Sequence, residues 1–174
     1  MTMRLHIGGA GAEAVPGWKV LDIQPGPSVD FVGDCTDLGQ FADGSIEEIY
    51  ASHVLEHLGY LEELPRALAE FHRVLKQGGC AKISVPDFDA LCRMFTEPGL
   101  TLDERILVMR MAFGGQTDPF DFHYVGLSAD ILGSLLKDAG FARAERVDEF
   151  RLFSDTSSHR FRGRLISLNL IAYK

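Results

Sequence analysis

The sequence predicts an α/β fold built on a mostly parallel sheet. Strand-like and helix-like runs alternate along most of the 174 residues, which is typical of parallel strands connected by helices. Two extended runs follow each other at 141–150 and 164–173. Consecutive strands indicate an antiparallel pair at one side of the sheet. The length fits a single domain, 1–174.

Each predicted element follows from its residues. Short apolar runs predict five earlier strands, at 4–7, 19–23, 30–32, 48–52 and 81–85. The longest helix is expected over 61–77, where apolar residues recur at helical spacing and Gly78 and Gly79 follow. Pro65 fits only a first turn, so the regular part is expected to begin near Leu64.

Three shorter helices are predicted further along the chain. They are expected at 88–95, from 101 to about 114 and from 128 to about 140. Thr101 and Glu104 form a capping box at the start of the second, and Ser128 and Gly140 bound the third.

Composition excludes several classes of protein. Hydrophobic residues make up 46% of the chain and charged residues 24%, as in globular proteins. No apolar run is long enough for a membrane span or a secretory signal. Three cysteines, Cys35, Cys80 and Cys92, form no CxxC pair, so we expect reduced thiols and a cytoplasmic location.

Charge argues against nucleic acid as a general partner. The net charge is −8, whereas nucleic-acid binding needs a basic face. The basic run at 159–164 is the one candidate surface for an acidic partner. Its alternative interpretation is a solvated loop.

Chemistry-bearing residues follow each of the first four strands. A glycine-rich turn begins at Gly8, Asp22 ends the second strand, Asp34 follows the third, and Ser52 and His53 follow the fourth. The carboxyl ends of parallel strands meet at one edge of a sheet, where ligands bind. An aspartate after the second strand can accept both hydroxyls of a ribose, and Asp34 can meet an adenine amino group. The glycine turn alone is equally consistent with a tight turn without a ligand.

Longer stretches extend this pattern over most of the chain. They are 5–11, 17–22, 32–34, 51–58, 72–79, 84–87 and 167–169. The most specific is Val-Leu-Glu-His-Leu at 54–58, followed by Arg-Val-Leu-Lys-Gln-Gly-Gly at 73–79. With these motifs the chain resembles class I S-adenosylmethionine-dependent methyltransferases, of the small bacterial type 11-like kind.

The resemblance implies a Rossmann-like seven-stranded sheet in the order 3-2-1-4-5-7-6, with helices on both faces and an antiparallel strand 7. It also implies S-adenosylmethionine as cofactor. The implied cofactor-binding residues are Gly8, Gly9, Gly11, Asp22, Ile23, Asp34, Cys35, Ser52 and His53. The glycines would face the methionine part, Asp22 the ribose and Asp34 the adenine, while Ser52 and His53 would border the sulfonium.

The chain departs from the family pattern in two places. Ala10 stands where the family usually has glycine, and only 8–18 connects the first two strands. That segment is too short for an ordinary crossover helix, so we expect this helix to be shortened or missing. Apolar sheet surface that this helix leaves bare would favour a homodimer. The carboxylate of the cofactor would no longer face the N-terminus of that helix, so the cofactor would bind more weakly.

Three residues are candidates for catalysis. His53 lies beside the expected sulfonium, His123 lies in an aromatic loop, and Asp87 follows the fifth strand; each could position a nucleophile or accept its proton. Each residue also has a structural interpretation. His53 could form a hydrogen bond that orders its loop, the aromatic residues around His123 could form a small satellite core, and Asp87 could cap the N-terminus of the following helix. His53, Glu56 and His57 also have the HxxEH spacing of some zinc enzymes, but no third ligand is obvious, and no metal is predicted.

We therefore expect methyl transfer to an oxygen, nitrogen or carbon acceptor. The open site favours a bulky acceptor, such as a glycan or a lipid-linked or carrier-bound group. A non-catalytic module of the same fold, binding S-adenosylmethionine or a protein partner, is the alternative that Ala10 and the missing helix favour. A nicotinamide-dependent oxidoreductase is disfavoured, because Gly8 and Asp22 are closer than the roughly 20 residues of the dinucleotide fingerprint.

Overall fold

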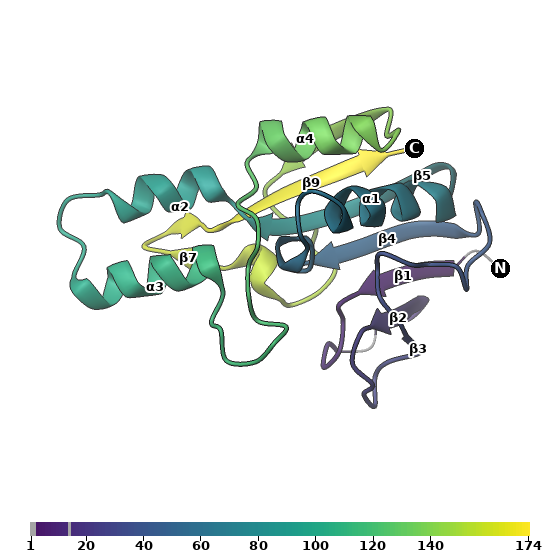
Figure 1. The fold of residues 1–174 in the computed structure, drawn as a ribbon, viewed down its shortest axis with the longest axis horizontal. Coiled ribbons are helices and arrows are strands. Elements are labelled where there is room, and N and C mark those ends of the chain that lie inside the picture. Colours follow the sequence, from purple (N-terminus) through teal and green to yellow (C-terminus); the bar gives the residue numbers. More distant parts are fainter. Residues whose placement is uncertain (1–2, 14) are drawn as a thin grey trace.

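The computed structural model describes residues 3–13 and 15–174. Its centre is a seven-stranded sheet in the order β3-β2-β1-β4-β5-β9-β6 (Figure 1). The strands are β1 (Met3–Ile7), β2 (Trp18–Asp22), β3 (Phe31–Val32), β4 (Ile46–Ser52), β5 (Leu75–Pro86), β6 (Arg143–Val147) and β9 (Ser167–Tyr173). β1 to β5 are parallel, and β9 runs antiparallel to β5 and β6. The predicted fold, strand order and terminal antiparallel pair are confirmed, with β9 in the place of strand 7.

The remaining elements lie between these strands. They are η1 (Leu55–His57), α1 (Glu63–Val74), α2 (Phe88–Phe95), α3 (Leu102–Phe113), α4 (Ala129–Asp138), η2 (Thr156–Ser158) and the hairpin of β7 (Arg160–Phe161) and β8 (Arg164–Leu165). α3 begins at the predicted capping box, whose Thr101 side chain accepts from the Glu104 amide. Within the described residues, no helix is long and apolar enough to cross a membrane.

The helix predicted over 61–77 ends earlier, at Val74. Leu75 already pairs with Ile46 of β4, whereas Glu48 pairs with Cys80, so the β5 residues between these pairs form a bulge. A side chain on Gly79 would lie 2.8 Å from the Glu47 carbonyl oxygen. The two glycines therefore shape a bulged strand, and their prediction as a helix end was wrong.

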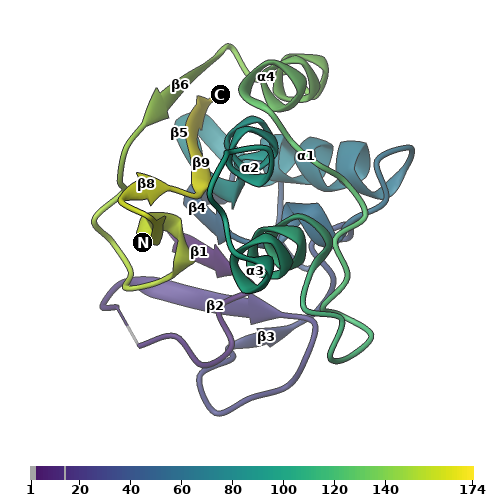
Figure 2. The ribbon, with the colours of Figure 1, turned by 90° about the vertical axis from the view of Figure 1, so that its left-hand side faces the viewer.

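One face of the sheet carries the main hydrophobic core. α1 and α4 pack on this face (Figure 2), together with side chains from the 33–45 loop. Alternate residues of the strands point into it, as the two-residue period of a strand requires. The core residues include Leu5, Ile7, Leu21, Ile49, Leu64, Leu68, Phe71, Ile83, Leu132, Leu136 and Leu168.

The opposite face is covered differently. Among the described residues no α-helix packs on this face, although the resemblance implied helices on both faces. The described part of the connection from β1 to β2 also contains no helix, as predicted. Two aromatic side chains from the segment after β6 cover the sheet where the first crossover helix would lie. Phe150 and Phe153 lie with ring centroids 5.5 and 4.7 Å from that of Tyr50, and Phe153 also lies 4.2 Å from His6.

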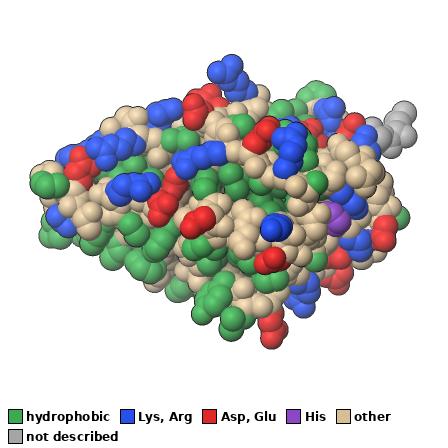
Figure 3. Space-filling model, turned by 90° about the horizontal axis from the view of Figure 1, so that it is seen from above, with side chains coloured by type: hydrophobic (Ala, Val, Ile, Leu, Met, Phe, Trp, Pro, Cys, Tyr) green, Lys and Arg blue, Asp and Glu red, His purple; other side chains and the backbone are tan. Residues whose placement is uncertain are grey.

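Ion pairs cover another part of this opposite face. Glu48 on β4 forms ion pairs with Arg4 on β1, at 3.6 Å, and with Lys82 on β5. The aromatic cover and these ion pairs leave less bare apolar surface on β1, β4 and β5 than expected, and the homodimer stays a prediction. Exposed apolar side chains gather instead on α3, at the left-hand end of the molecule (Figures 1 and 3). They are Leu102, Ile106, Leu107, Met109 and Phe113.

The basic run at 159–164 meets acids of its own chain. Arg162 binds Glu104 at 2.8 Å, and Arg164 binds Glu97 at 2.8 Å. These pairs attach the β7–β8 hairpin to α3 and to the α2–α3 connection. An acidic partner for this run is thus supplied internally.

Phe153 should contribute to stability in place of the missing helix. Replacing it with Ala removes contacts to His6, Trp18 and Tyr50, and we expect a loss of about 2–3 kcal/mol in the free energy of unfolding. Urea unfolding followed by circular dichroism measures this. Leu61→Ala is the control, because Leu61 is 79% exposed; equal effects of the two substitutions would contradict the assignment.

Candidate functional site

The ends of the first four strands converge on one cavity. Its volume is about 260 Å³, and it lies at the carboxyl ends of β1 to β4, as expected for an open α/β sheet. Six of the nine predicted cofactor-binding residues line it: Gly8, Asp22, Ile23, Asp34, Cys35 and His53. We call this the first cavity.

Asp22 joins two edges of the first cavity. Its Oδ2 accepts a hydrogen bond from the Ala10 amide and its Oδ1 one from the Gln24 amide, both at 2.9 Å. The carboxylate thereby fixes the turn after β1 relative to the end of β2. A carboxylate oxygen has two lone pairs, so each oxygen can still accept a hydrogen bond from a ligand hydroxyl.

Asp34 and Cys35 form the wall beyond β3. The Asp34 side chain is exposed, and its Oδ1 accepts from the Thr36 amide at 2.8 Å. Burial raises the pKa of the Cys35 thiol to about 12, so Cys35 stays neutral and acts as an apolar contact. Both residues are therefore suited to holding a flat polar group rather than to reacting with it.

The glycines of the first turn are required mainly by protein neighbours. A side chain on Gly8, which has φ +73°, would collide with Val54, and one on Gly9 would lie 2.8 Å from His6 Nδ1. Gly11 has φ +84° and open space where a side chain would be. The tight-turn interpretation thus accounts for all three glycines, Gly8 and Gly9 by crowding and Gly11 by its positive φ, while Gly8 also lines the first cavity.

A second cavity of about 600 Å³ lies on the other side of this turn. Gly9, Gly11 and Ser52, the remaining predicted cofactor-binding residues, line it, as does Ala10. The Ala10 side chain therefore does not occupy the first cavity. No Lys or Arg is among the described residues that line the second cavity, which instead includes Glu13 and Asp155.

His53 is held at both ring nitrogens. Its backbone has φ +54°. Its Nδ1 lies 3.0 Å from Glu56 Oε1, and its Nε2 lies 2.9 Å from Ser167 Oγ. His53 thus orders the loop after β4, as the alternative interpretation proposed, and at the same time lines the first cavity.

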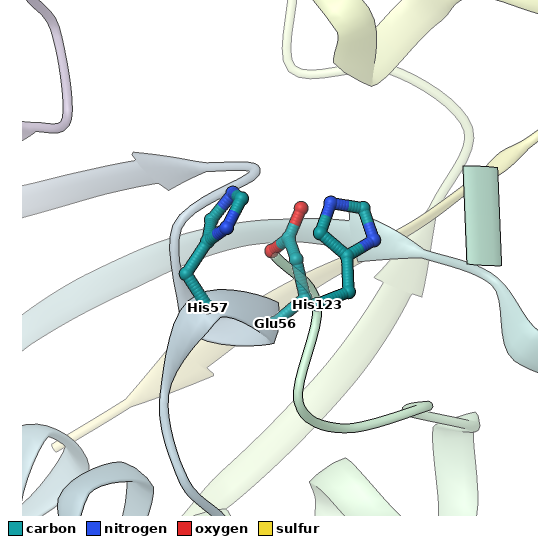
Figure 4. A group of neighbouring side chains, drawn as sticks. All are labelled: Glu56, His57 and His123. Carbon is teal, nitrogen blue, oxygen red and sulfur yellow. The ribbon is translucent and has the colours of Figure 1, made fainter. Parts of the chain in front are cut away.

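Glu56, His57 and His123 form a cluster beside His53. Figure 4 shows the Glu56 carboxylate next to the two imidazole rings, which are in T-shaped contact with centroids 4.8 Å apart. Glu56 is 1% exposed, and His57 Nδ1 donates to the Phe122 carbonyl at 3.0 Å. Burial lowers the pKa of His123, which favours its neutral form.

An aromatic loop faces the first cavity from the side opposite the strand ends. Phe120, Phe122 and Tyr124 line the cavity and remain partly exposed, at 50%, 36% and 59%. The Tyr124 amide donates to the Glu56 carbonyl at 2.8 Å. The loop is therefore attached to η1, and its aromatic side chains are available to a ligand.

Asp87 lies outside the residues that line either cavity. Its Oδ1 accepts from the Ala90 amide at 3.0 Å, which caps α2, and its Oδ2 binds Arg146 at 2.7 Å. Both oxygens are engaged in structural contacts. This arrangement favours the N-cap interpretation over that of a general base.

Sequence reasoning missed the cluster as a unit. The spacing of His53, Glu56 and His57 was visible, but His123 comes from a distant loop that only the fold brings beside them. Of the three catalytic candidates, only His53 lines the first cavity. His123 does not line it but contacts His57, which does, and Asp87 lies apart from both.

The strand order and the cavity at the carboxyl strand ends define the fold of class I methyltransferases. The family described as a methyltransferase domain matches residues 15–83, from before β2 into β5. The predicted resemblance to S-adenosylmethionine-dependent methyltransferases is thereby confirmed. No curated protein matches the sequence.

Several solved structures share the fold. A possible histamine N-methyltransferase from Thermotoga maritima is 18% identical, with a TM-score of 0.61, over 100% of this chain and 83% of its own. An S-adenosylmethionine-dependent methyltransferase from Archaeoglobus fulgidus is 17% identical, with a TM-score of 0.62, over 99% and 86%. The 1,6-didemethyltoxoflavin-N1-methyltransferase of Burkholderia thailandensis, solved with S-adenosylhomocysteine, is 17% identical, with a TM-score of 0.59, over 99% and 71%.

His6, which lies beneath the glycine turn, should make stability depend on pH. Burial lowers its pKa from 6.5 to about 4, although Asp155 and Asp22 act in the opposite direction. As the pH falls from 6.5 towards 4, the unfolded chain binds a proton that the folded chain excludes, so stability decreases by up to about 3 kcal/mol.

Urea unfolding between pH 7 and 4 measures this contribution. His6→Leu removes the titrating group while keeping an apolar side chain of similar size, and should give a shallower loss of stability towards acid than the parent protein. Identical pH slopes for the two proteins would refute the assignment.

Proposed function

We propose that residues 1–174 form one methyltransferase-like domain that transfers a methyl group from S-adenosylmethionine to an acceptor at the first cavity. The observation that carries this proposal is the convergence of Gly8, Asp22, Asp34 and His53 on that cavity. These residues come from the ends of four strands and present the polar groups that an adenosine requires. Bound there, the cofactor supplies a methyl group on a positively charged sulfur.

The residues fit the adenosine part of this cofactor well. Asp22 retains acceptor capacity for ribose hydroxyls beside its two backbone partners. Asp34 has one oxygen engaged by the Thr36 amide and can accept from the adenine amino group with the other. Ile23 and the neutral Cys35 provide apolar surface for the ring.

The methionine part would extend past Gly8, which lines both cavities. In the second cavity, Asp155 and Glu13 can attract the amino group, while no described Lys or Arg in its lining faces the carboxylate. The described residues of the β1–β2 connection also form no helix whose N-terminus would favour that anion. We therefore expect weaker cofactor binding than in relatives that have this helix.

His53 and His123 are the residues that we assign to the acceptor side. For a hydroxyl acceptor, the oxygen forms the new bond to carbon, the electron pair of the broken carbon–sulfur bond stays on sulfur, and the proton passes to a base. The His53 ring, held by Glu56 and Ser167, can position the acceptor or accept that proton. Asp87 remains a third candidate, although its carboxylate is engaged elsewhere.

The aromatic loop supports an acceptor with an apolar or aromatic part. Phe120, Phe122 and Tyr124 offer partly exposed rings at the mouth of the first cavity, and such side chains bind flat apolar groups. Because these rings are partly exposed, a bulky acceptor, including a glycan or a carrier-linked group, could still reach the first cavity. The free state of Cys35, Cys80 and Cys92 supports a cytoplasmic location.

Asp34 should be needed for cofactor binding. Asp34→Ala removes a charged hydrogen-bond acceptor from the first cavity, and we expect calorimetry to find S-adenosylhomocysteine bound at least about tenfold more weakly. Asp37→Ala is a matched control, because Asp37 likewise accepts from the amide two residues on, at 3.0 Å from Gly39, but does not line the cavity. Unchanged binding by the Asp34 variant would overturn the placement of the adenine.

An assay of methyl transfer distinguishes an enzyme from a protein that only binds the cofactor. Labelled S-adenosylmethionine is incubated with a panel of aromatic hydroxyl and amine compounds, and methylated product is counted. Replacing His53 and His123 together with Ala should lower the turnover by about 10²-fold or more, while His159→Ala, at an exposed position, should not. Cofactor binding without transfer to any acceptor would favour the non-catalytic alternative.

A further inference from the structure

Glu56 is a buried carboxylate without adequate polar partners. It is 1% exposed, and neither of its oxygens accepts a well-directed hydrogen bond from the described residues. His53 Nδ1, 3.0 Å from Oε1, is a neighbouring polar atom. Buried carboxylates in proteins are normally hydrogen-bonded, paired or bound to metal ions, and the His53 contact engages only Oε1, which leaves room for a further positive partner.

Two histidines next to Glu56 present free ring nitrogens. His57 donates from Nδ1 to the Phe122 carbonyl at 3.0 Å, which leaves the Nε2 lone pair for a ligand. Histidines that bind metal usually donate their other nitrogen to a carbonyl or carboxylate in this way. Nδ1 of His123 is buried and has no hydrogen-bond partner among the described residues.

The three side chains point toward one another. One donor atom from each of Glu56, His57 and His123 lies within 4.8 Å of the others, and Figure 4 shows the three side chains as neighbours. Ligand atoms on one zinc ion lie roughly 3.3 Å apart, given bonds of about 2.0 Å. Small rotations of the side chains bring the donors to that separation.

We propose that Glu56, His57 and His123 bind one divalent transition-metal ion. Two imidazoles and one carboxylate suit zinc, cobalt, manganese or iron, whereas magnesium and calcium prefer oxygen ligands. His53 contacts Glu56 from outside this set and acts as a positioning residue. The ion would balance the buried charge of Glu56, which the protein otherwise leaves poorly compensated.

A three-residue site leaves coordination positions for other ligands. His57 lines the first cavity, so the ion would lie at the wall where the acceptor binds. There it would take an oxygen ligand, such as a phenol, enol or sugar hydroxyl, and lower its pKa. The hydroxyl proton would then pass to His53 or to water, and the oxygen would form the bond to the methyl carbon while the electron pair of the broken carbon–sulfur bond stays on sulfur. This role rests on the proposed function; binding of the ion does not.

Metal binding is tested on the full chain without a histidine tag, after removal of metals with a chelator. Zinc is titrated by calorimetry, cobalt by its visible absorption, and bound metal is counted by mass spectrometry. We expect one ion per chain. Glu56→Gln, His57→Gln and His123→Gln should each weaken binding by at least about tenfold, whereas His159→Ala, which removes an exposed histidine, should leave it unchanged.

Binding of S-adenosylhomocysteine to each metal-free variant shows that it is folded and separates the two proposals. Cofactor binding without stoichiometric metal would overturn the metal site and leave the proposed function standing. Metal binding without cofactor binding would overturn the proposed function and leave the metal site standing. Equal zinc affinity in the parent protein and all three cluster variants would also overturn the site.

Discussion

The carboxylate of Asp22 holds the site together. The amides of the turn after β1 need side-chain acceptors, and Asp22 Oδ2 accepts from the Ala10 amide. Ser28 Oγ accepts from the next one, on Gly11, at 3.1 Å. The same carboxylate caps the end of β2 through Gln24. The shape of the first cavity therefore depends on a residue that also faces the ligand, and a substitution there changes the turn and the binding group together.

The missing first helix is replaced by chain from the other end of the sequence. Phe153 covers His6 and Tyr50, and the Tyr50 hydroxyl donates to Asp155 Oδ2 at 2.7 Å, which attaches the 150–158 segment to the sheet. This segment also forms one wall of the second cavity. It restores burial over β1 and β4 but brings carboxylates instead of the positive end of a helix dipole, so the electrostatics around a bound anion differ from those of a complete crossover.

The parts of this structure that could be predicted from the sequence depend on local signals. The Thr101 capping box can be recognised from the next few residues alone. The acids at the strand ends can be placed together once the sheet is known to be parallel. Gly78 and Gly79 misled the prediction because the same pair suits a helix end and a strand bulge, and pairing of Leu75 with Ile46 decided between them. The cover by Phe153 and the approach of His123 to Glu56 depend on contacts between distant segments, which no local pattern reveals.

The short segment after β4 connects the side of the site proposed for the cofactor with the side proposed for the acceptor. His53 lies at the first cavity, and Glu56 and His57 attach the aromatic loop: the Glu56 carbonyl accepts from the Tyr124 amide, and His57 donates to the Phe122 carbonyl. A ligand that moves η1 must therefore also move the rings of the loop. His53, whose backbone has φ +54°, comes two residues before η1, so the cofactor side and the acceptor side are connected through one short segment. Correct placement of an acceptor against a bound cofactor thus depends on this segment more than on either cavity alone.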